Sequence, residues 1–247
     1  MDSLMQMPSH SGTLLNCSIE KNLSQSYALE SELLRGVLPI EDGLKAERSR
    51  GGTFDLNCRT TIAKKVGLSL NQMFCYTQII DPLVLERRPV SQFAYANSDS
   101  SVIRRGFETN LRADYKLAKL FVGDTFTDAK AGYLPGSRIL PLTPKSKINS
   151  SLIVEEHDRF KVGIEAHYTG RQTLADRLSA RSYVVVGAFS EKTFKNFSLF
   201  INAENITDVR QSRDGQVVFP HSAAPTFSEV FARLEGRVFI GGIKIRF

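Results

Sequence analysis

A strict alternation of apolar and polar residues constrains the fold more than any other feature of the sequence. The alternation starts in residues 51–62, where Phe54 and Leu56 alternate with Asp55 and Asn57, and it continues almost to the C-terminus. Because successive side chains of a β-strand point to opposite faces, a period of two predicts strands with one apolar and one polar face. Roughly nine such segments follow one another, each about ten residues long, which is the length of a tilted strand that crosses a bilayer.

The connections between these segments support the same interpretation, because short and long ones alternate. The short ones are residues 63–66, 116, 157–159 and 193–196, and the long ones are 81–100, 132–145, 172–181 and 208–235. Outer-membrane barrels have short periplasmic turns and long extracellular loops. The sequence therefore predicts an all-β, antiparallel transmembrane barrel portion whose last strand runs inward and brings Phe247 to the periplasmic side.

Composition excludes two other classes of protein. No apolar run approaches the 18 or so residues of a membrane helix, and the mean hydropathy is −0.17. A barrel is still allowed, because only alternate residues of its strands face lipid. The net charge of +6 comes from 32 Lys and Arg that are scattered among 26 Asp and Glu. No basic stripe with interleaved aromatic residues is present, so the sequence does not favour a nucleic-acid partner.

The sequence predicts no enzyme, cofactor or metal site. The four histidines lack metal-ligand spacing, and the three cysteines form no CxxC pair. No Ser, Cys or Thr has a recognisable base partner. Gly241 and Gly242 lie inside the last strand segment, where close packing or strand curvature is a better explanation than nucleotide binding.

Alternation assigns charged residues to the polar, lumen-facing side of the predicted barrel. These candidates are Arg59, Arg112, Glu165, His167, Arg171 and Glu204. Aromatic residues near strand ends fit the interfacial girdle of a membrane barrel. They include Phe74, Tyr76, Tyr115, Tyr168, Tyr183, Phe189 and Phe197.

Three sequence elements resemble TonB-dependent outer-membrane receptors, the class that includes siderophore, cobalamin and colicin receptors. Residues 46–49, AERS, resemble the junction of a loop and a strand in that family, and residues 168–171, YTGR, resemble one of its strand ends. The closing region, with NITD at residues 205–208 and a terminal Phe247, resembles the last hairpin of the family. The resemblance covers roughly residues 38–247.

The resemblance implies a fold and a function. The chain would supply about the last nine strands of a barrel of about 22 strands, without the N-terminal plug. The full receptor takes up a scarce ligand such as a ferric siderophore, haem, cobalamin or a glycan. Implied partners are outer-membrane lipid, the barrel-assembly machinery and, only through the missing plug, the TonB complex. The assembly signal would be Phe247 with Ile245, Ile243 and Phe239.

Residues 1–50 are expected to form a poorly defined N-terminal segment and an extracellular loop, ahead of the barrel portion at 51–247. A short helix is compatible with residues 26–38, and the first residues given do not have the pattern expected of a secretory signal. A partial barrel would expose strand edges in lipid, so we expect a truncated product or an incomplete sequence that does not transport alone. The alternatives are a porin-like or adhesin barrel and a soluble β-sandwich binding module.

Overall fold

The structure is a computed structural model, and it describes residues 13–15, 43–87, 93–175, 177–219 and 226–245. The helix suggested for residues 26–38, and Phe247, lie outside these residues. No helix among them is long and apolar enough to cross a membrane.

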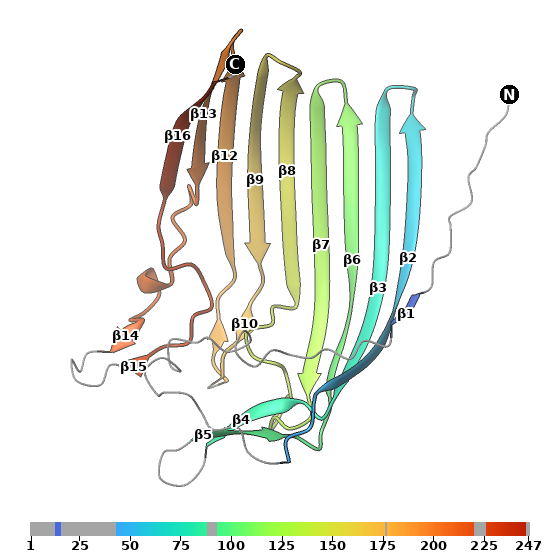
Figure 1. The fold of residues 1–247 in the computed structure, drawn as a ribbon, viewed down its shortest axis with the longest axis vertical. Helices are drawn as coiled ribbons and strands as arrows, with labels where there is room; N and C mark the ends of the chain where they lie inside the picture. The colour runs from blue at the N-terminus through green and yellow to red at the C-terminus, as the bar shows by residue number, and fades with distance from the viewer. Residues whose placement is uncertain (1–12, 16–42, 88–92, 176, 220–225, 246–247) are drawn as a thin grey trace, which may run out of the picture.

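One antiparallel sheet dominates the structure, with the strand order β1-β2-β3-β6-β7-β8-β9-β12-β13-β16. Apart from the three-residue β1 (Thr13–Leu15), it consists of nine long strands, as the alternation predicts (Figure 1). They are β2 (Arg48–Ile62), β3 (Val66–Ile80), β6 (Val102–Tyr115), β7 (Ala118–Ala131), β8 (Ser146–Glu156), β9 (Phe160–Thr169), β12 (Tyr183–Thr193), β13 (Phe197–Glu204) and β16 (Val238–Ile245). The first four long strands have 14 or 15 residues, more than the ten expected, because pairing continues beyond the apolar stretch toward the long connections.

The predicted alternation of connections is confirmed. Tight turns of two or three residues join β2 to β3, β6 to β7, β8 to β9 and β12 to β13, and all lie at one end of the sheet (Figure 1). The long connections lie at the other end and contain three small hairpins and a 3-10 helix. These are β4 (Leu83–Arg87) with β5 (Phe93–Asn97), β10 (Gln172–Thr173) with β11 (Ser179–Ala180), β14 (Val218–Phe219) with β15 (Thr226–Phe227), and η2 (Gln211–Arg213). Below, the two ends are called the turn end and the loop end.

Cross-strand register gives the sheet an apolar face and a polar face. Along one row, Leu70 pairs with Leu111 and Leu111 with Val122; along the adjacent row, Asn71 pairs with Asn110 and Asn110 with Gly123. Directly paired residues share a face, so apolar side chains stay together from strand to strand. The apolar face includes Leu68, Leu120, Leu152, Ile164, Ala188, Ile201 and Ile243.

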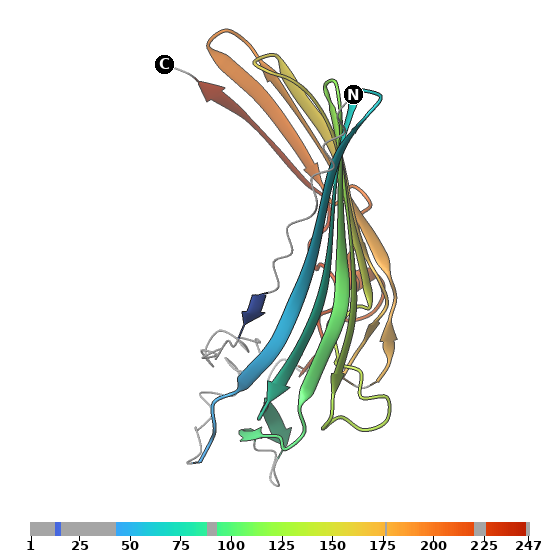
Figure 2. The ribbon, with the colours of Figure 1, turned by 90° about the vertical axis from the view of Figure 1, so that its right-hand side faces the viewer.

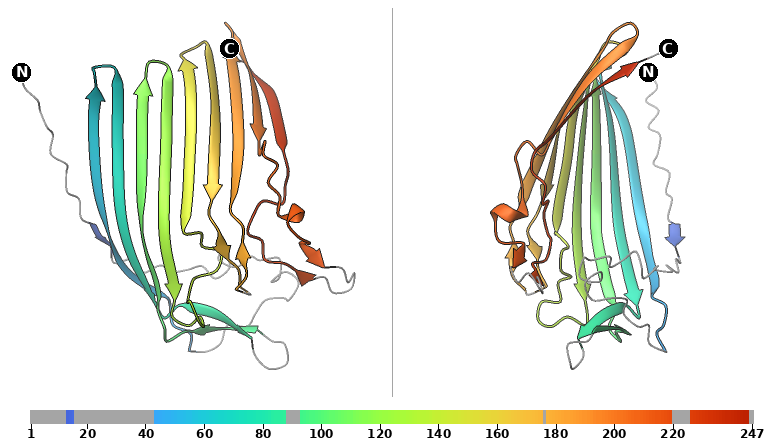
Figure 3. Two further views of the ribbon diagram at one scale, coloured as in Figure 1. Left: turned by 180° about the vertical axis from the view of Figure 1, so that it is seen from behind. Right: turned by 60° about the vertical axis from the view of Figure 1, so that its left-hand side comes forward.

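The apolar face is not covered by a second layer of the described chain. Figures 2 and 3 show the sheet as a single curved layer. On this face Ile164 is 50% exposed and Ile201 57% exposed. Among the residues that the structure describes, the buried hydrophobic ones are five alanines with Tyr95, Val102 and Val185. A water-soluble fold of this size would bury a far larger apolar core.

A row of phenylalanines crosses the apolar face toward the loop end. Phe54 pairs with Phe74, Phe74 with Phe107, and Phe107 with Phe126, each eight residues from the turn-end limit of its strand. Eight residues span about 27 Å along a strand, or about 21 Å across the membrane at a tilt of about 40°, which lies toward the far edge of an apolar band of about 25 Å. This row fits one side of an aromatic girdle.

Phe189, expected in the girdle, lies on the polar face instead. It pairs with Gly163, and an added Cβ at that glycine would lie 2.6 Å from the Phe189 ring. Phe200 likewise pairs with Gly242, where a Cβ would lie 2.7 Å from its ring. Each ring thus occupies the space above a glycine of the neighbouring strand. For Gly242 this is the first of the two explanations that the sequence allows, close packing or strand curvature.

We predict that Gly242→Ala destabilises the sheet by about 1–2 kcal/mol, because the new methyl group displaces the Phe200 ring. The measurement is the urea midpoint of the chain refolded in detergent micelles, followed by circular dichroism. Gly241→Ala is the matched control, since its Cβ would meet only the Phe200 carbonyl oxygen at 3.6 Å. Equal midpoints for the two variants would contradict the packing argument.

Candidate functional site

The polar face brings several of the predicted lumen residues into one row. Arg59 pairs with Ser69 and Ser69 with Arg112. The row continues through Phe121 and Ser151 to Glu165. The Arg112 guanidinium donates to both oxygens of Asp114 at 2.8 and 3.0 Å and lies 5.4 Å from the centre of the Phe121 ring. Arg59, Arg112 and Glu165 are exposed on the polar face, and their role in a lumen stays a prediction.

A second row beside it consists mainly of amides, and His167 is its one member among the lumen-facing candidates predicted from the sequence. Its members are Asn57, Asn71, Asn110, Gly123, Asn149 and His167. Nδ2 of Asn71 donates to Oδ1 of Asn57 at 2.9 Å, and Nδ1 of His167 lies 2.9 Å from Oδ1 of Asn149, within hydrogen-bond distance. Side chains of both rows line a shallow hollow of about 310 Å³. The hollow offers amide, imidazole and guanidinium groups to a polar ligand or protein surface.

Opposite charges alternate along the polar face near the turn end. Lys119 forms an ion pair with Glu155, which also lies 3.8 Å from Lys161. Glu191 of β12, the strand next to β9, and Lys244 of β16 are 2.8 Å apart. This ladder leaves the turn end of the polar face strongly hydrated with little net charge.

The other predicted residues do not join these rows. Glu204 is on the polar face but at the loop end, 4.0 Å from Arg233, and Arg171 lies in the connection after β9. Phe239, Ile243 and Ile245 share the apolar face of β16, where Phe239 is 66% exposed. Their proposed role as an assembly signal stays a prediction.

Each of the three sequence elements that resemble receptor motifs lies at the loop end of a long strand. At the first, the Glu47 carboxylate, 9% exposed, accepts a 2.8 Å hydrogen bond from the backbone N–H of Leu83. The side chain of Asn97 bonds the backbone of Lys45 and the carbonyl of Asp81. The base of the β4–β5 connection is thereby tied to the start of β2.

At the second element, the chain leaves β9 through Gly170. Its N–H donates to the carbonyl of Ser146 at 2.9 Å, and an added Cβ would lie 2.8 Å from the same oxygen. Only glycine fits this approach, which explains the glycine of the YTGR segment physically.

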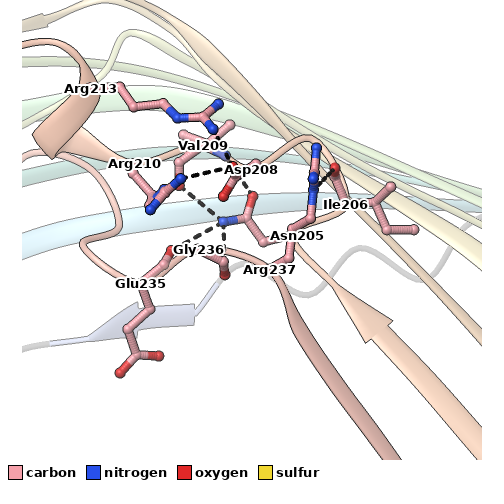
Figure 4. Close-up of polar contacts among 9 residues, drawn as sticks. All are labelled: Asn205, Ile206, Asp208, Val209, Arg210, Arg213, Glu235, Gly236 and Arg237. Carbon is pink, nitrogen blue, oxygen red and sulfur yellow. Dashed lines mark hydrogen bonds and ion pairs between the residues drawn. The ribbon is translucent and has the colours of Figure 1, made fainter.

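At the third element, a buried amide holds the long connection between β13 and β16 (Figure 4). Asn205 is 1% exposed and has φ +49. Its Nδ2 donates to the carbonyls of Val209, Glu235 and Gly236 at 3.0, 3.2 and 3.3 Å, and its Oδ1 accepts from the N–H of Val209 at 2.9 Å. One side chain therefore joins the start of the connection to its end, more than 30 residues later.

Asp208 adds an ionic contact to the same cluster. Burial opposes its ionisation, but the hydrogen bond from Arg210 and the charges of Arg210, Arg213 and Arg237 outweigh burial, so the pKa of Asp208 lies below its ordinary value. Gly236 packs against this carboxylate, since a Cβ there would lie 2.8 Å from Oδ1. Asp208 thus stays ionised at neutral pH and keeps its ion pairs with Arg210 and Arg213.

A second buried amide, Gln211, continues this support. Its Oε1 accepts from the N–H of Phe231 at 2.8 Å and its Nε2 donates to the carbonyl of Glu229 at 2.7 Å. Gln211 cannot be recognised from the sequence, because its partners lie about 20 residues away and follow no short motif.

Searches for relatives by sequence found nothing: no family model and no curated protein matches the chain. Within the described residues, no cluster of three or more His, Cys, Asp or Glu could hold a metal ion.

Solved structures, in contrast, share the fold. The copper transporter OprC matches with a TM-score of 0.61 at 19% identity, over 83% of this chain and 32% of OprC. The FrpB iron transporter from Neisseria meningitidis matches with a TM-score of 0.59 at 16% identity, over 85% of this chain and 33% of FrpB. A variant of the ferric enterobactin receptor from Pseudomonas aeruginosa, solved in complex with enterobactin, matches with a TM-score of 0.54 at 17% identity, over 69% of this chain and 27% of the receptor.

These structures are TonB-dependent receptor barrels, and the likeness confirms the predicted fold as part of such a barrel. The chain spans about a third of the length of the first two.

We predict that Asn205→Ala loosens the connection of residues 205–237. The change leaves three carbonyls and one N–H without their hydrogen-bond partner, and it places alanine at a left-handed φ. The free energy of local unfolding of the connection should therefore fall by about 2–3 kcal/mol. Limited trypsin digestion in micelles measures this as cleavage within the connection that is about thirtyfold faster or more. Asn202→Ala, three residues earlier in β13, is the control and should cleave at the parent rate. Equal rates for both variants would show that the amide does not hold the connection.

Proposed function

We propose that the chain forms a section of the wall of an outer-membrane TonB-dependent receptor for active uptake of a scarce ligand. The exposed apolar face, continuous over nine strands, carries this proposal. The ligand class would be a ferric siderophore, haem, cobalamin or a glycan.

The different side chains on the two faces of the sheet are best explained by lipid on one side and water on the other. Side chains such as Leu70, Leu152 and Ile164 are exposed on one face, while Arg112, Glu165 and His167 occupy the other. Lipid against the first face and water against the second would satisfy both, as in a transmembrane barrel with a polar interior. A soluble sandwich needs a second sheet on the apolar face, and the described chain provides none.

The likeness to transporters of iron and copper and to an enterobactin receptor supports uptake over simple diffusion. The loop end fits such a role, because buried Asn205 and Gln211 hold a long connection in a defined shape. Loops held in this manner are suited to capturing a ligand. A porin-like barrel is the second candidate and is supported by the same two faces.

The isolated chain would not transport. In the described sheet, β16 has no partner on its outer side, and β2 meets only the three residues of β1 there. Unpaired backbone groups cost several kcal/mol each in hydrocarbon. Closure of the barrel would require further strands. Coupling of uptake to energy would require a plug and the TonB complex. Lipid and the barrel-assembly machinery would be partners during insertion, with β16 presenting Phe239, Ile243 and Ile245.

The test is refolding of the full 247-residue chain with phosphatidylcholine vesicles, followed by flotation in a density gradient. We expect the chain to float with the vesicles, to show no heat-modifiable band and to give no uptake of ferric enterobactin. Chain that stays in the aqueous fraction would overturn the membrane assignment. A heat-modifiable, protease-resistant barrel would overturn the claim that the chain cannot close alone.

A matched pair of variants makes flotation specific for the apolar face. Leu111→Arg places a charge on this face and should cost about 2–4 kcal/mol near the bilayer centre, lowering the floating fraction at least about tenfold. Asn110→Arg, one residue earlier on the polar face, should float like the parent chain. An equal drop in the floating fraction for both variants would mean that the apolar face does not determine binding of the chain to the vesicles.

A further inference from the structure

A hollow of about 440 Å³ lies at the loop end, between the connection that contains β10 and β11 and the longer connection that contains β14 and β15. Figure 1 shows β10, β14 and β15 at this end of the sheet. Leu174 and Ala175 line the hollow from the first connection, and residues between Gln211 and Phe231 line it from the second. Its volume is in the range of small-molecule sites. All of its lining residues lie outside the nine long strands.

The lining of this hollow combines aromatic rings with negative charge. Three phenylalanines contribute, Phe219, Phe227 and Phe231, and the first two are 47% and 41% exposed. The carboxylates of Asp214 and Glu229 line it as well, whereas no Lys, Arg or His does among the residues that the structure describes. The lining therefore has a charge of −2, although the whole chain has a net charge of +6.

The two carboxylates have different partners. Asp214 forms an ion pair with Arg181. Oε2 of Glu229 accepts a hydrogen bond from the backbone N–H of Ala175 at 2.7 Å, and within the described residues no Lys or Arg forms an ion pair with Glu229. The negative charge of the hollow that lacks a basic partner is therefore on Glu229, at the junction of the two connections.

Buried hydrogen bonds hold Phe231 and Glu229 in place. The Phe231 carbonyl accepts from Nε2 of Gln172 at 3.1 Å and from Oη of Tyr183 at 3.2 Å. Gln211 bonds the N–H of Phe231 and the carbonyl of Glu229, as described above. One aromatic ring and one carboxylate are thus positioned before any ligand arrives, which reduces the entropy lost on binding.

We propose that this hollow binds an organic cation, specifically an ammonium group with alkyl substituents. The positive charge lies next to the Glu229 carboxylate, and the alkyl groups lie against the phenylalanines. The negative π-face of an aromatic ring attracts such a cation, most strongly where water is excluded. The inference goes beyond the proposed uptake function and does not depend on it, because neither face of the strands takes part.

Other ligand classes fit this lining less well. An anionic ligand would meet two like charges and no basic side chain of the described residues. A neutral apolar ligand of the same shape would contact the phenylalanines but would gain nothing from Glu229. The charge of the ligand is therefore the property that the experiment must vary.

The experiment compares two probes of nearly equal shape, choline and its uncharged analogue 3,3-dimethylbutan-1-ol. The full chain is refolded in micelles of an uncharged detergent, and saturation-transfer difference NMR follows the methyl signal of each probe, with empty micelles as the blank. We expect choline to bind at least about fivefold more tightly than the analogue. Equal affinities, or no binding of choline, would overturn the proposal, and this comparison needs no variant.

Glu229→Gln tests the role of the carboxylate. The glutamine keeps an oxygen that accepts the hydrogen bond from Ala175, so the connection should stay folded and be cleaved by trypsin at the parent rate. The affinity for choline should fall at least about fivefold, while binding of the analogue stays unchanged. Phe231→Leu, which keeps an apolar side chain but removes the ring, should also weaken choline binding several-fold.

Glu235→Gln is the matched control. Glu235 follows Glu229 by six residues in the same connection, carries the same charge, is exposed and does not line the hollow. Its replacement should leave the affinity for choline unchanged. An equal loss in Glu229→Gln and Glu235→Gln would overturn the site, because net charge alone would then explain the binding.

Discussion

Backbone hydrogen bonds between neighbouring strands determine which side chains stand beside one another, and here a single register runs from β2 to β16. A slip of one residue at any pair would move every later apolar side chain to the polar face. The same register that pairs Leu70 with Leu111 also pairs Asn71 with Asn110. The apolar surface, the amide row and the charged ladder are therefore consequences of one set of strand pairings.

At the loop end, where strands separate, buried polar side chains replace strand pairing. Glu47, Asn205 and Gln211 each bond backbone groups that no neighbouring strand satisfies. Such groups would be costly to leave unpaired, which explains why these side chains are almost completely buried. The long connections thus start and end at defined positions.

The sequence alone predicted the features that depend on local pattern. Alternation assigned Arg59, Arg112 and Glu165 to one face, and the spacing of segments predicted which connections are short. The positions of Phe189 and of the amide row depended on partners in other strands, which one sequence does not reveal. Residue type alone predicts Phe189 in the girdle. The strand register instead places its ring over Gly163 on the polar face.

The division of the sheet into a lipid face and a water face is tested most directly along a single strand. Nitroxide labels at successive positions of β9 (Phe160–Thr169), in the chain without its native cysteines and reconstituted in vesicles, report collision with oxygen or with a water-soluble nickel complex. We predict a period of two, with oxygen favoured at Val162, Ile164 and Ala166 and nickel favoured at Lys161, Glu165 and His167. Equal access of the nickel complex to both sets would contradict the account.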